Sequence, residues 1–400
     1  MEQKLKQFPA GFLWGAATSS YQIEGGLRND WSEWEHSKKR VTNLERQSFN
    51  PIDFQSGKAA DSWNRLEEDI VCLKKINASA YRFSIEWARI EPEEGRFDQV
   101  AIQRYAHFIA RLHEEGIEPF ITLWHWPLPL WLRDKGGWAS TSIVSYFEKY
   151  TQRLVEAFPT VKFWLTLNEP TIYSGNSYFR GIWPPQKKNP FCYLRVLSHL
   201  IKAHRAAYKV IKNELPKSQV GIATPNIDFE AAPGFINKWI VAAVAWWWNH
   251  YFLDHIKNEQ DFIGLNYYFH HRISYGMNKN KNERVNDMGW ELYPQGVTHV
   301  LKDLSDRYHK PIYITENGTA DEDDDHRAWY INEVLKHVHE SIEQGIDVRS
   351  YLHWSLIDNF EWALGFEKKF GLFEVDYRTF ERRPRPSVET FARIAKNNSL

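Results

Sequence analysis

The feature that most constrains the fold is a regular alternation of two kinds of segment along the chain. Short runs rich in β-branched and aromatic residues, bounded by turn residues, predict strands. Longer stretches with apolar residues three and four positions apart follow them and predict helices. The predicted strands are Gly11–Ala17, Ala78–Ile85, Glu118–Leu123, Lys162–Leu167, Gln219–Thr224, Asp261–Asn266, Pro311–Thr315 and Arg349–His353. The predicted helices include Asp61–Ile76, Asp98–Glu115, Ser142–Ala157, Leu194–Glu214, Phe235–Ile256, Tyr293–Arg307 and His326–Gln344.

Eight strand–helix units in 400 residues predict an α/β fold, a (β/α)8 barrel. Several strands, such as the FWLTL run that begins at Phe163, are apolar almost throughout. Parallel strands covered on both faces have this character. No Pro/Gly/Ser linker, repeat or low-complexity tract divides the chain, so we expect residues 1–400 to form one catalytic domain. A doubly wound open sheet would show the same alternation, and the pattern alone leaves it open.

Charge and cysteine usage narrow the classes of partner. The chain has 50 Lys plus Arg and 51 Asp plus Glu, so its formal charge is −1. No global field attracts a polyanion, and we expect neither nucleic acid nor a membrane as a partner. Cys72 and Cys192 alone make no disulfide framework, and no apolar leader precedes Ala10, so we expect a cytoplasmic protein. The apolar run Trp239–Trp248 is too short to span a bilayer and predicts a buried helix.

Polar side chains stand where the predicted strands end, which is where a barrel of this type builds its active site. Glu169 and Glu316 each follow an apolar strand directly. A carboxylate there is costly to desolvate without partners. Either one alone would be interpreted as a strand-end residue paired with a local cation. Two such sites together favour an active site. The other polar and aromatic candidates at strand ends are Gln22, Arg82, His125, Asn168, Asn266, Tyr268 and Trp354.

Seven segments around these residues match one known family. They are FLWGAATSSYQIEG from Phe12, YRFSIEWARI from Tyr81, TLWHW from Thr122, TLNEP from Thr166, FIGLNYY from Phe262, YITENG from Tyr313 and LHWSLIDNFEW from Leu352. In this order they resemble glycoside hydrolase family one, the β-glucosidase and β-galactosidase family, and they extend from Phe12 to about Ser387. The resemblance implies a (β/α)8 barrel and a retaining mechanism.

The resemblance also implies a role for each candidate. Glu169 would be the acid/base and Glu316 the nucleophile, which fits the two carboxyl groups, roughly 5–5.5 Å apart, of a retaining glycosidase. Arg82 and Tyr268 would lie beside the nucleophile, and Asn168 would bind the 2-hydroxyl of the sugar. Other residues would bind the terminal sugar, namely Gln22, His125, Asn266, Tyr268, Glu361 and Trp362, with Trp354 as an aromatic floor. Glu361, in place of the serine of relatives that act on 6-phosphorylated sugars, favours unphosphorylated substrates.

The function expected from the sequence is a retaining β-glucosidase that also accepts β-galactosides and β-fucosides. It would hydrolyse terminal non-reducing sugars from small β-glycosides through a covalent intermediate, without a cofactor or a metal ion. A catalytically weak sugar-binding barrel and a transglycosidase remain as alternatives.

One departure from the family concerns the entrance to the site. Only the 36 residues from Pro225 to Gln260 separate the predicted fifth and sixth strands, where the family commonly has a much longer excursion. A shortened wall predicts an open entrance with Trp183 and Trp246–Trp248 exposed, and tolerance of bulky or flat aglycones. The alternative places Trp246–Trp248 on a helix packed against the barrel, with at most one ring at the rim.

Overall fold

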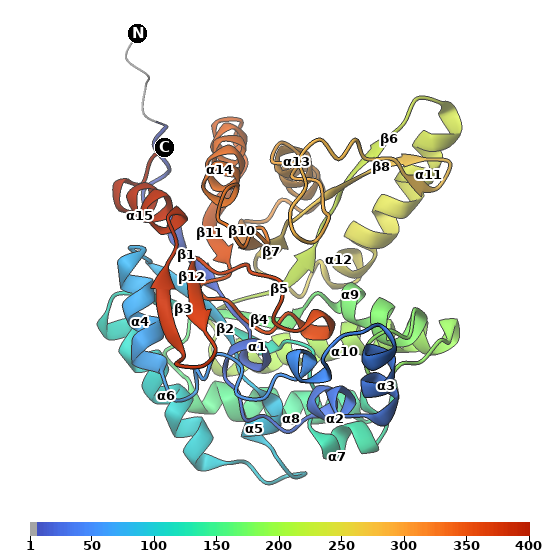
Figure 1. Ribbon diagram of the computed structural model, residues 1–400, viewed down its shortest axis with the longest axis vertical. Helices are drawn as coiled ribbons and strands as arrows, with labels where there is room; N and C mark the ends of the chain where they lie inside the picture. The colour runs from blue at the N-terminus through green and yellow to red at the C-terminus, as the bar shows by residue number, and fades with distance from the viewer. Residues whose placement is uncertain (1–5) are drawn as a thin grey trace.

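The computed structural model describes residues 6–400, and its centre is a closed barrel of eight parallel strands (Figure 1). The barrel strands are β1 (Leu13–Ala17), β2 (Ala80–Ser84), β3 (Glu118–Trp124), β4 (Phe163–Asn168), β5 (Gln219–Pro225), β7 (Ile263–Asn266), β10 (Ile312–Asn317) and β11 (Val348–Trp354). Their order around the barrel is β1-β11-β10-β7-β5-β4-β3-β2. Because β1 pairs with both β2 and β11, the sheet has no edge. The predicted (β/α)8 barrel is confirmed, and the open sheet is excluded.

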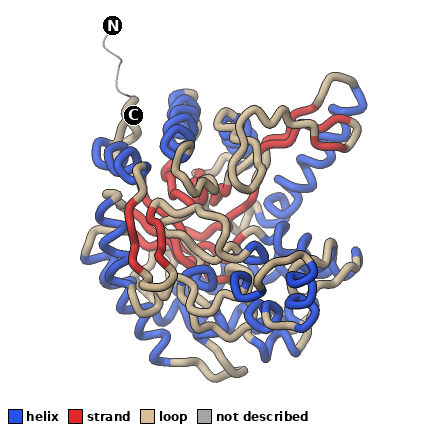
Figure 2. The backbone as a smooth tube through the Cα atoms, in the orientation of Figure 1, coloured by secondary structure: helices blue, strands red, loops and turns tan. Residues whose placement is uncertain are grey.

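Helices surround the barrel, as the tube view in Figure 2 shows. The longer ones are α4 (Leu66–Lys75), α6 (Gln99–Glu114), α8 (Ile143–Ala157), α10 (Pro190–Glu214), α11 (Phe235–Ala245), α13 (Gly296–Tyr308), α14 (Arg327–Glu343) and α15 (Ser387–Asn397). Shorter ones are α1 (Ser20–Ile23), α2 (Asp30–Glu35), α3 (Lys38–Arg46), η1 (Pro51–Phe54), α5 (Trp87–Ile90), α7 (Leu130–Asp134), η2 (Gly137–Ala139), α9 (Pro170–Ser174), η3 (Gly175–Phe179), η4 (Trp246–His250), α12 (Tyr251–Ile256) and η5 (Trp362–Leu364). None of the helices in residues 6–400 is both long and apolar enough to cross a membrane.

The amino-terminal half of the barrel interior is filled by aromatic rings. Phe120 and Phe163 stack with their centroids 4.2 Å apart, and Phe262 and Tyr313 pack beside them with centroids 4.9 Å apart. Buried rings of this size leave no channel through the barrel. Space for a ligand therefore lies at the carboxyl ends of the strands.

A small sheet beside the barrel was not predicted. Strand β6 (Asp228–Ala231) follows β5 and pairs in parallel with β8 (His270–Ser274), and β9 (Met277–Asn278) pairs with β8. With α11 these strands project at the upper right of Figure 1. A separate hairpin, β12 (Phe373–Asp376) with β13 (Glu381–Pro384), lies in front of the barrel in that view.

The prediction that Trp239–Trp248 form a buried helix is wrong about burial. A helix covers these residues, but the side chain of Trp239 is 65% exposed and that of Phe235 is 73% exposed. Helix α11 packs against β6, β8 and η4 at the side of the barrel. A helix that is apolar on all sides is normally enclosed by other elements. Here the small sheet covers only part of the helix, which leaves an apolar surface open to solvent.

Candidate active site

A cavity of about 1140 Å³ lies at the carboxyl ends of the barrel strands. Nine of the eleven residues predicted for the site line it, namely His125, Asn168, Glu169, Asn266, Tyr268, Glu316, Trp354, Glu361 and Trp362. The other two, Gln22 and Arg82, are fully buried behind this lining and hydrogen-bond to residues that face the cavity. The fold therefore brings all the predicted residues together.

Glu316, near the end of β10, has a donor on each carboxylate oxygen. The guanidinium of Arg82 donates to Oε1 at 2.5 Å, and the hydroxyl of Tyr268 donates to Oε2 at 2.6 Å. The turn after the strand needs a glycine, because a Cβ on Gly318 would stand 1.8 Å from the carbonyl oxygen of Trp354. Charge-assisted hydrogen bonds of this kind stabilise a carboxylate in its ionised form.

Glu169 stands in a different environment, directly after β4. Its backbone adopts a left-handed conformation with φ 44° and ψ 57°, and its carboxyl accepts a hydrogen bond of 2.9 Å from the amide of Asn266. Burial raises the pKa of Glu169 to about 8, and the charge of Glu316 contributes to the rise. Both effects favour the protonated form of Glu169. Strained backbone at a non-glycine residue is common where a side chain must be aimed precisely.

Two asparagines link the two glutamates. Asn168 accepts a hydrogen bond of 2.7 Å from Arg82 through its Oδ1, and the Nδ2 of Asn266 lies 3.3 Å from the same oxygen. The Nδ2 of Asn168 is 2.9 Å from the Nε2 of His125. Burial and the charge of Arg82 hold the pKa of His125 well below its usual value, so its ring is neutral and Nε2 can accept this bond. The network holds Asn168, Asn266 and both carboxyl groups in one arrangement.

The predicted sugar-binding residues form a polar corner and an aromatic wall. Gln22 donates to Glu361 at 3.2 Å and to Asn359 at 2.8 Å. Burial and the charge of Glu316 raise the pKa of Glu361 to about 8. The ring of His125 is roughly parallel to those of Trp354 and Trp362, with centroid distances of 5.9 and 6.0 Å. A flat apolar face beside hydrogen-bonding groups matches the two kinds of surface on a pyranose ring.

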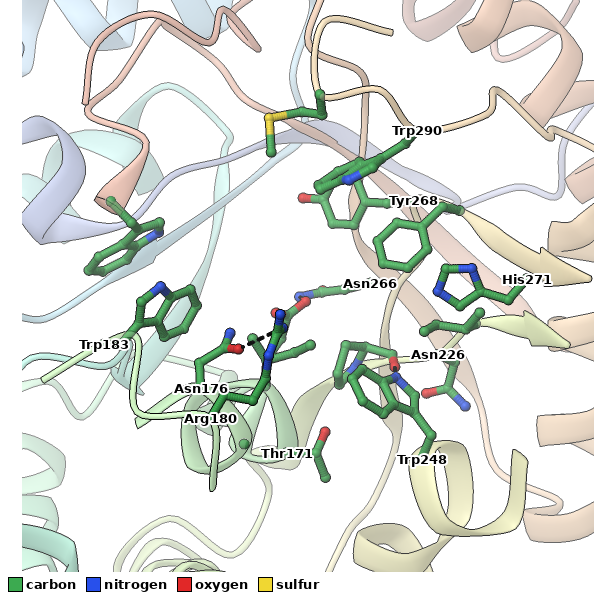
Figure 3. Close-up of a pocket in the computed structure, with 18 of the residues that line it drawn as sticks. Thr171, Asn176, Arg180, Trp183, Asn226, Trp248, Asn266, Tyr268, His271 and Trp290 are labelled. Carbon is green, nitrogen blue, oxygen red and sulfur yellow. Dashed lines mark hydrogen bonds between the residues drawn. The ribbon is translucent and has the colours of Figure 1, made fainter. Parts of the chain in front are cut away.

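The outer part of the cavity includes residues that sequence reasoning missed. Asn226 follows β5, Phe229 lies on β6 and His271 lies on β8, and all three line the cavity. Figure 3 shows Asn226 and His271 on one side of the pocket and Trp183 on the other. Asn226 directly follows a barrel strand, so the rule that located the other polar residues could have found it. The other two depend on the small sheet.

The tryptophans of the shortened connection also face the cavity. Trp247 and Trp248 both line it and are half-buried, whereas Trp246 is 43% exposed and lies over a second, smaller hollow. All three lie on helix η4, as the alternative expected, and only Trp246 is exposed, so the predicted exposure of Trp183, Trp247 and Trp248 is wrong. Trp183, also predicted at the entrance, lines the cavity opposite them and is half-buried.

A barrel with a glutamate at the end of each of two strands, one with a raised pKa and one paired with arginine, has the groups that glycoside hydrolysis requires. Comparison with known proteins agrees. The model of glycosyl hydrolase family 1 matches residues 4–233 and 248–400. The 1,4-beta-D-glucan glucohydrolase of Thermotoga neapolitana is 35% identical over 451 aligned positions, which cover 99% of this chain and 100% of that protein. Beta-glucosidase A of Thermotoga maritima is 34% identical, with 99% of each chain covered.

Solved structures give the same result. The beta-glycosidase from Pyrococcus horikoshii superposes with a TM-score of 0.91 at 37% identity, covering 99% of this chain and 96% of that one. The beta-glucosidase from Thermotoga maritima in complex with glucoimidazole gives a TM-score of 0.92 at 33% identity, covering 99% and 100%. The chain belongs to glycosyl hydrolase family 1 and is a glycoside hydrolase. Residues 234–247, which lie in the shortened connection, fall outside the family match.

Proposed function

We propose that this protein is a retaining β-glucosidase that also accepts β-galactosides and β-fucosides and releases the terminal non-reducing sugar from small β-glycosides. The observation that carries the proposal is the contrast between the two glutamates. Glu316 has Arg82 and Tyr268 on its two oxygens, whereas Glu169 has one amide donor and a pKa raised to about 8. A retaining glycosidase needs one ionised and one protonated carboxyl group.

In the proposed reaction, Glu316 attacks the anomeric carbon while Glu169 gives its proton to the departing glycosidic oxygen. The product is a covalent glycosyl-enzyme and a free aglycone alcohol. Glu169, now ionised, then takes a proton from a water molecule that attacks the anomeric carbon and releases Glu316. Tyr268 and Arg82 keep the nucleophile oriented. Because the reacting groups are all side chains, the proposal invokes no cofactor.

The terminal sugar is held by the groups around these two carboxyls. Asn168, next to the acid in sequence, would bind the 2-hydroxyl, where contacts strengthen in the transition state. Glu361, with Gln22 behind it, would bind the hydroxyls at the far side of the ring together with His125 and Trp362. Trp354 would support the ring face. Asn266 acts on the acid as well, since its amide donates to Glu169.

Two further parts of the proposal concern the chain as a whole. We assign residues 1–400 to one catalytic domain, because the barrel strands extend from Leu13 to Trp354 and α15 packs on α14. We place the enzyme in the cytoplasm, where reducing conditions suit the two free cysteines, Cys72 and Cys192.

Hydrolysis of a nitrophenyl β-glucoside tests the activity. Saturable release of nitrophenol supports the enzyme, whereas glucose binding without release supports a sugar-binding barrel. Transfer of the sugar to an added alcohol in preference to water would indicate a transglycosidase, which shares the covalent intermediate.

Azide rescue tests the assignment of roles. Glu316→Ala should abolish turnover, and azide should yield, if any product, the α-glycosyl azide. Glu169→Ala should still form the glycosyl-enzyme from a substrate with a good leaving group, and azide should then yield the β-glycosyl azide. Exchanged anomers would reverse the two roles.

A further inference from the structure

The loop between β11 and β12, residues 355–372, carries two of the residues proposed to hold the sugar. Glu361 and Trp362 both lie on it and line the cavity. Among residues 6–400, the carboxyl group of Glu361 has one hydrogen-bond partner, the amide of Gln22 at 3.2 Å. This distance is at the long end of the hydrogen-bond range. The direction of the Glu361 side chain therefore depends on the path of the loop backbone.

The backbone of this loop has an unfavourable conformation next to Glu361. Trp362 has φ 51°, in the left-handed region that residues other than glycine adopt infrequently. Such a conformation persists where surrounding contacts hold the backbone in place. The contacts that hold this loop therefore matter for the sugar site, even where they lie outside the cavity.

An ion pair lies at the start of the loop. The side chain of Asp358 is fully buried, and that of Arg385, which follows β13, is 8% exposed. Nη1 and Nη2 of the guanidinium donate to the two carboxylate oxygens at 3.1 and 2.9 Å. Two parallel bonds of this kind fix the orientation of both groups as well as their distance. Neither residue lines the cavity.

Arg385 also holds the end of the same loop. Its Nη1 donates to the carbonyl of Gly371 at 3.0 Å, and its backbone N–H donates to the carbonyl of Leu372 at 3.0 Å. The backbone N–H of Gly371 donates to Oδ1 of Asp358 at 2.9 Å. A Cβ on Gly371 would stand 2.2 Å from the backbone nitrogen of Asp358, so the two segments are in direct contact. One guanidinium therefore joins the two ends of the loop.

A short buried link connects the ion pair to the sugar site. Only Asn359 and Phe360 separate Asp358 from Glu361, and both are buried. Oδ1 of Asn359 accepts a hydrogen bond from Gln22 at 2.8 Å, and the backbone N–H of Phe360 donates to the carbonyl of Gln22 at 3.0 Å. Close-packed interiors transmit strain, because they contain little free space. A displacement of Asp358 should therefore move Glu361 as well.

We propose that Arg385 is a positioning residue for recognition of the sugar. It acts from outside the cavity, by holding the loop that directs Glu361 towards the hydroxyls at the far side of the ring, the 6-hydroxyl among them. The inference rests on the proposed β-glucosidase activity and on the proposed role of Glu361. Without the guanidinium, the buried carboxylate of Asp358 has to be solvated or protonated, and either change disturbs its bond to Gly371.

The ratio of kcat/KM for nitrophenyl β-D-glucoside to that for nitrophenyl β-D-xyloside measures this contact. The xyloside lacks the CH2OH group that bears the 6-hydroxyl, and the rest of the sugar and the leaving group are the same. Partial unfolding lowers both activities equally, so the ratio does not depend on the folded fraction. Arg385→Gln should lower the ratio about three- to tenfold, towards the value for Glu361→Ser.

Arg382→Gln is the matched control. Arg382 lies on β13, its side chain is 2% exposed, and it donates to the equally buried Asp69 on α4 at 2.9 Å. Its other side-chain bonds are to Phe380 and Ser62, which lie outside the loop. Loss of this ion pair should lower the melting temperature, as loss of the Arg385 pair does, and leave the ratio unchanged. A ratio that falls equally in both variants would overturn the inference.

Two further variants separate positioning from general damage. In the Glu361→Ser background, Arg385→Gln should cause no further fall in the ratio, because the residue through which it acts is gone. A full additional fall there would contradict the inference. Arg385→Lys keeps the charge beside Asp358 without the paired donors, so it should retain more of the ratio than Arg385→Gln does. If Arg385→Gln does not fold, Arg385→Lys decides: a fall of about twofold or more supports the inference, and an unchanged ratio refutes it.

Failure of this inference is distinct from failure of the proposed activity. If the wild type hydrolyses nitrophenyl β-glucoside and the Arg385 variants keep its ratio, the enzyme stands and the positioning role is wrong. If no glucoside is hydrolysed, the proposed activity is wrong, and the inference is wrong with it.

Discussion

The two ends of the cavity are built on opposite principles. At the inner end, side chains from the barrel strands are buried, and they form one hydrogen-bonded network from Glu169 to Glu316. At the outer end, α11 and the small sheet present apolar side chains, several of them exposed, and residues 234–247 fall outside the family match. We infer that the groups proposed to break the glycosidic bond stand on the barrel strands, while the part outside the family match would contact the aglycone.

The two ends of the cavity also differ in the interactions that a substitution would change. The inner end contains buried ionisable groups whose protonation depends on one another, since burial and then the charge of Glu316 raise the pKa values of both Glu169 and Glu361. A change there alters the reaction for every substrate. The outer end offers mainly contact area, so a change there should alter the preference among aglycones and leave the chemistry intact.

The largest effect should come from removing the acid at the inner end. Glu169→Gln should lower kcat/KM about 10²–10⁴-fold for alkyl glucosides, whose leaving groups need a proton, and far less for nitrophenyl glucosides. Because Glu169 acts in its protonated form, wild-type kcat/KM should fall as pH rises above the pKa of about 8. The variant should lack this fall.

The pH profile of kcat/KM for both substrates is the measurement. Glu156→Gln, on the exposed surface of α8, is a matched control and should behave as wild type. An alkaline limb that survives in Glu169→Gln would mean that another group titrates there.

The next prediction concerns the free energy of unfolding. It compares a buried carboxyl group at the inner end with an exposed one at the outer end. The pKa of Glu169 is raised from 4.5 to about 8 in the folded protein. The folded state therefore binds the proton more tightly, and the free energy of unfolding should decline as pH rises from about 4.5 to about 8. Glu169→Gln removes this group, so it should be more stable than wild type at pH 9, by on the order of 2–4 kcal/mol, and closer to it at pH 5.

Denaturant unfolding of both proteins at the two pH values tests this. Val244→Asp, at the outer end, should show no such pH-dependent gain. Its new carboxylate is exposed, so its pKa should be similar in the folded and unfolded states. A gain for Glu169→Gln that is equal at pH 5 and pH 9 would argue against the raised pKa.

A smaller loss should follow from the polar corner of the sugar site. Glu361→Ser removes a hydrogen-bond partner of Gln22 and the group that we propose binds two sugar hydroxyls. Leaving a buried hydroxyl without its partner costs roughly 1–3 kcal/mol each, so the loss of contacts to two hydroxyls should lower kcat/KM for glucosides more than tenfold. The fall should be the same for butyl and octyl glucosides, because the inner end acts on every substrate.

Glu367→Ser, on the exposed part of the same loop, serves as the control. The Glu361 variant should also lose less activity towards a 6-phosphorylated glucoside than towards glucose derivatives, since the carboxyl group that would face the phosphate is gone. An unchanged kcat/KM would place Glu361 outside the sugar site.

The sequence predicted the inner end well and the outer end poorly. The barrel strands are found within about two residues of the predicted ones, because short apolar runs bounded by turns are a local signal. The motifs at their ends predicted that Glu169 and Glu316 share one site, and both line the same cavity. The bond between Asn266 and Glu169 was not predictable, since it joins side chains 97 positions apart.

At the outer end the local signal was misleading. Strands β6 and β8 are four and five residues long, and their partners lie about forty positions apart, so no pattern within either one indicates the pairing. The apolar run of α11 predicted burial because burial is the usual fate of such a helix. What lies beside a helix depends on tertiary contacts that composition does not encode.

The smallest effect should appear at the outer end with rigid aglycones. If the entrance is open, aryl β-glucosides with leaving groups of equal acidity, such as matched phenols and naphthols, should differ in kcat/KM by no more than about threefold, because an apolar surface without a fixed shape discriminates weakly. The same series should show parallel losses in Glu361→Ser, since that residue does not contact the aglycone. Initial rates at low substrate concentration give kcat/KM directly. A steep fall with aglycone size would mean that another loop closes the entrance. Trp183, opposite Asn226 in Figure 3, would then be the first residue to replace with a smaller one.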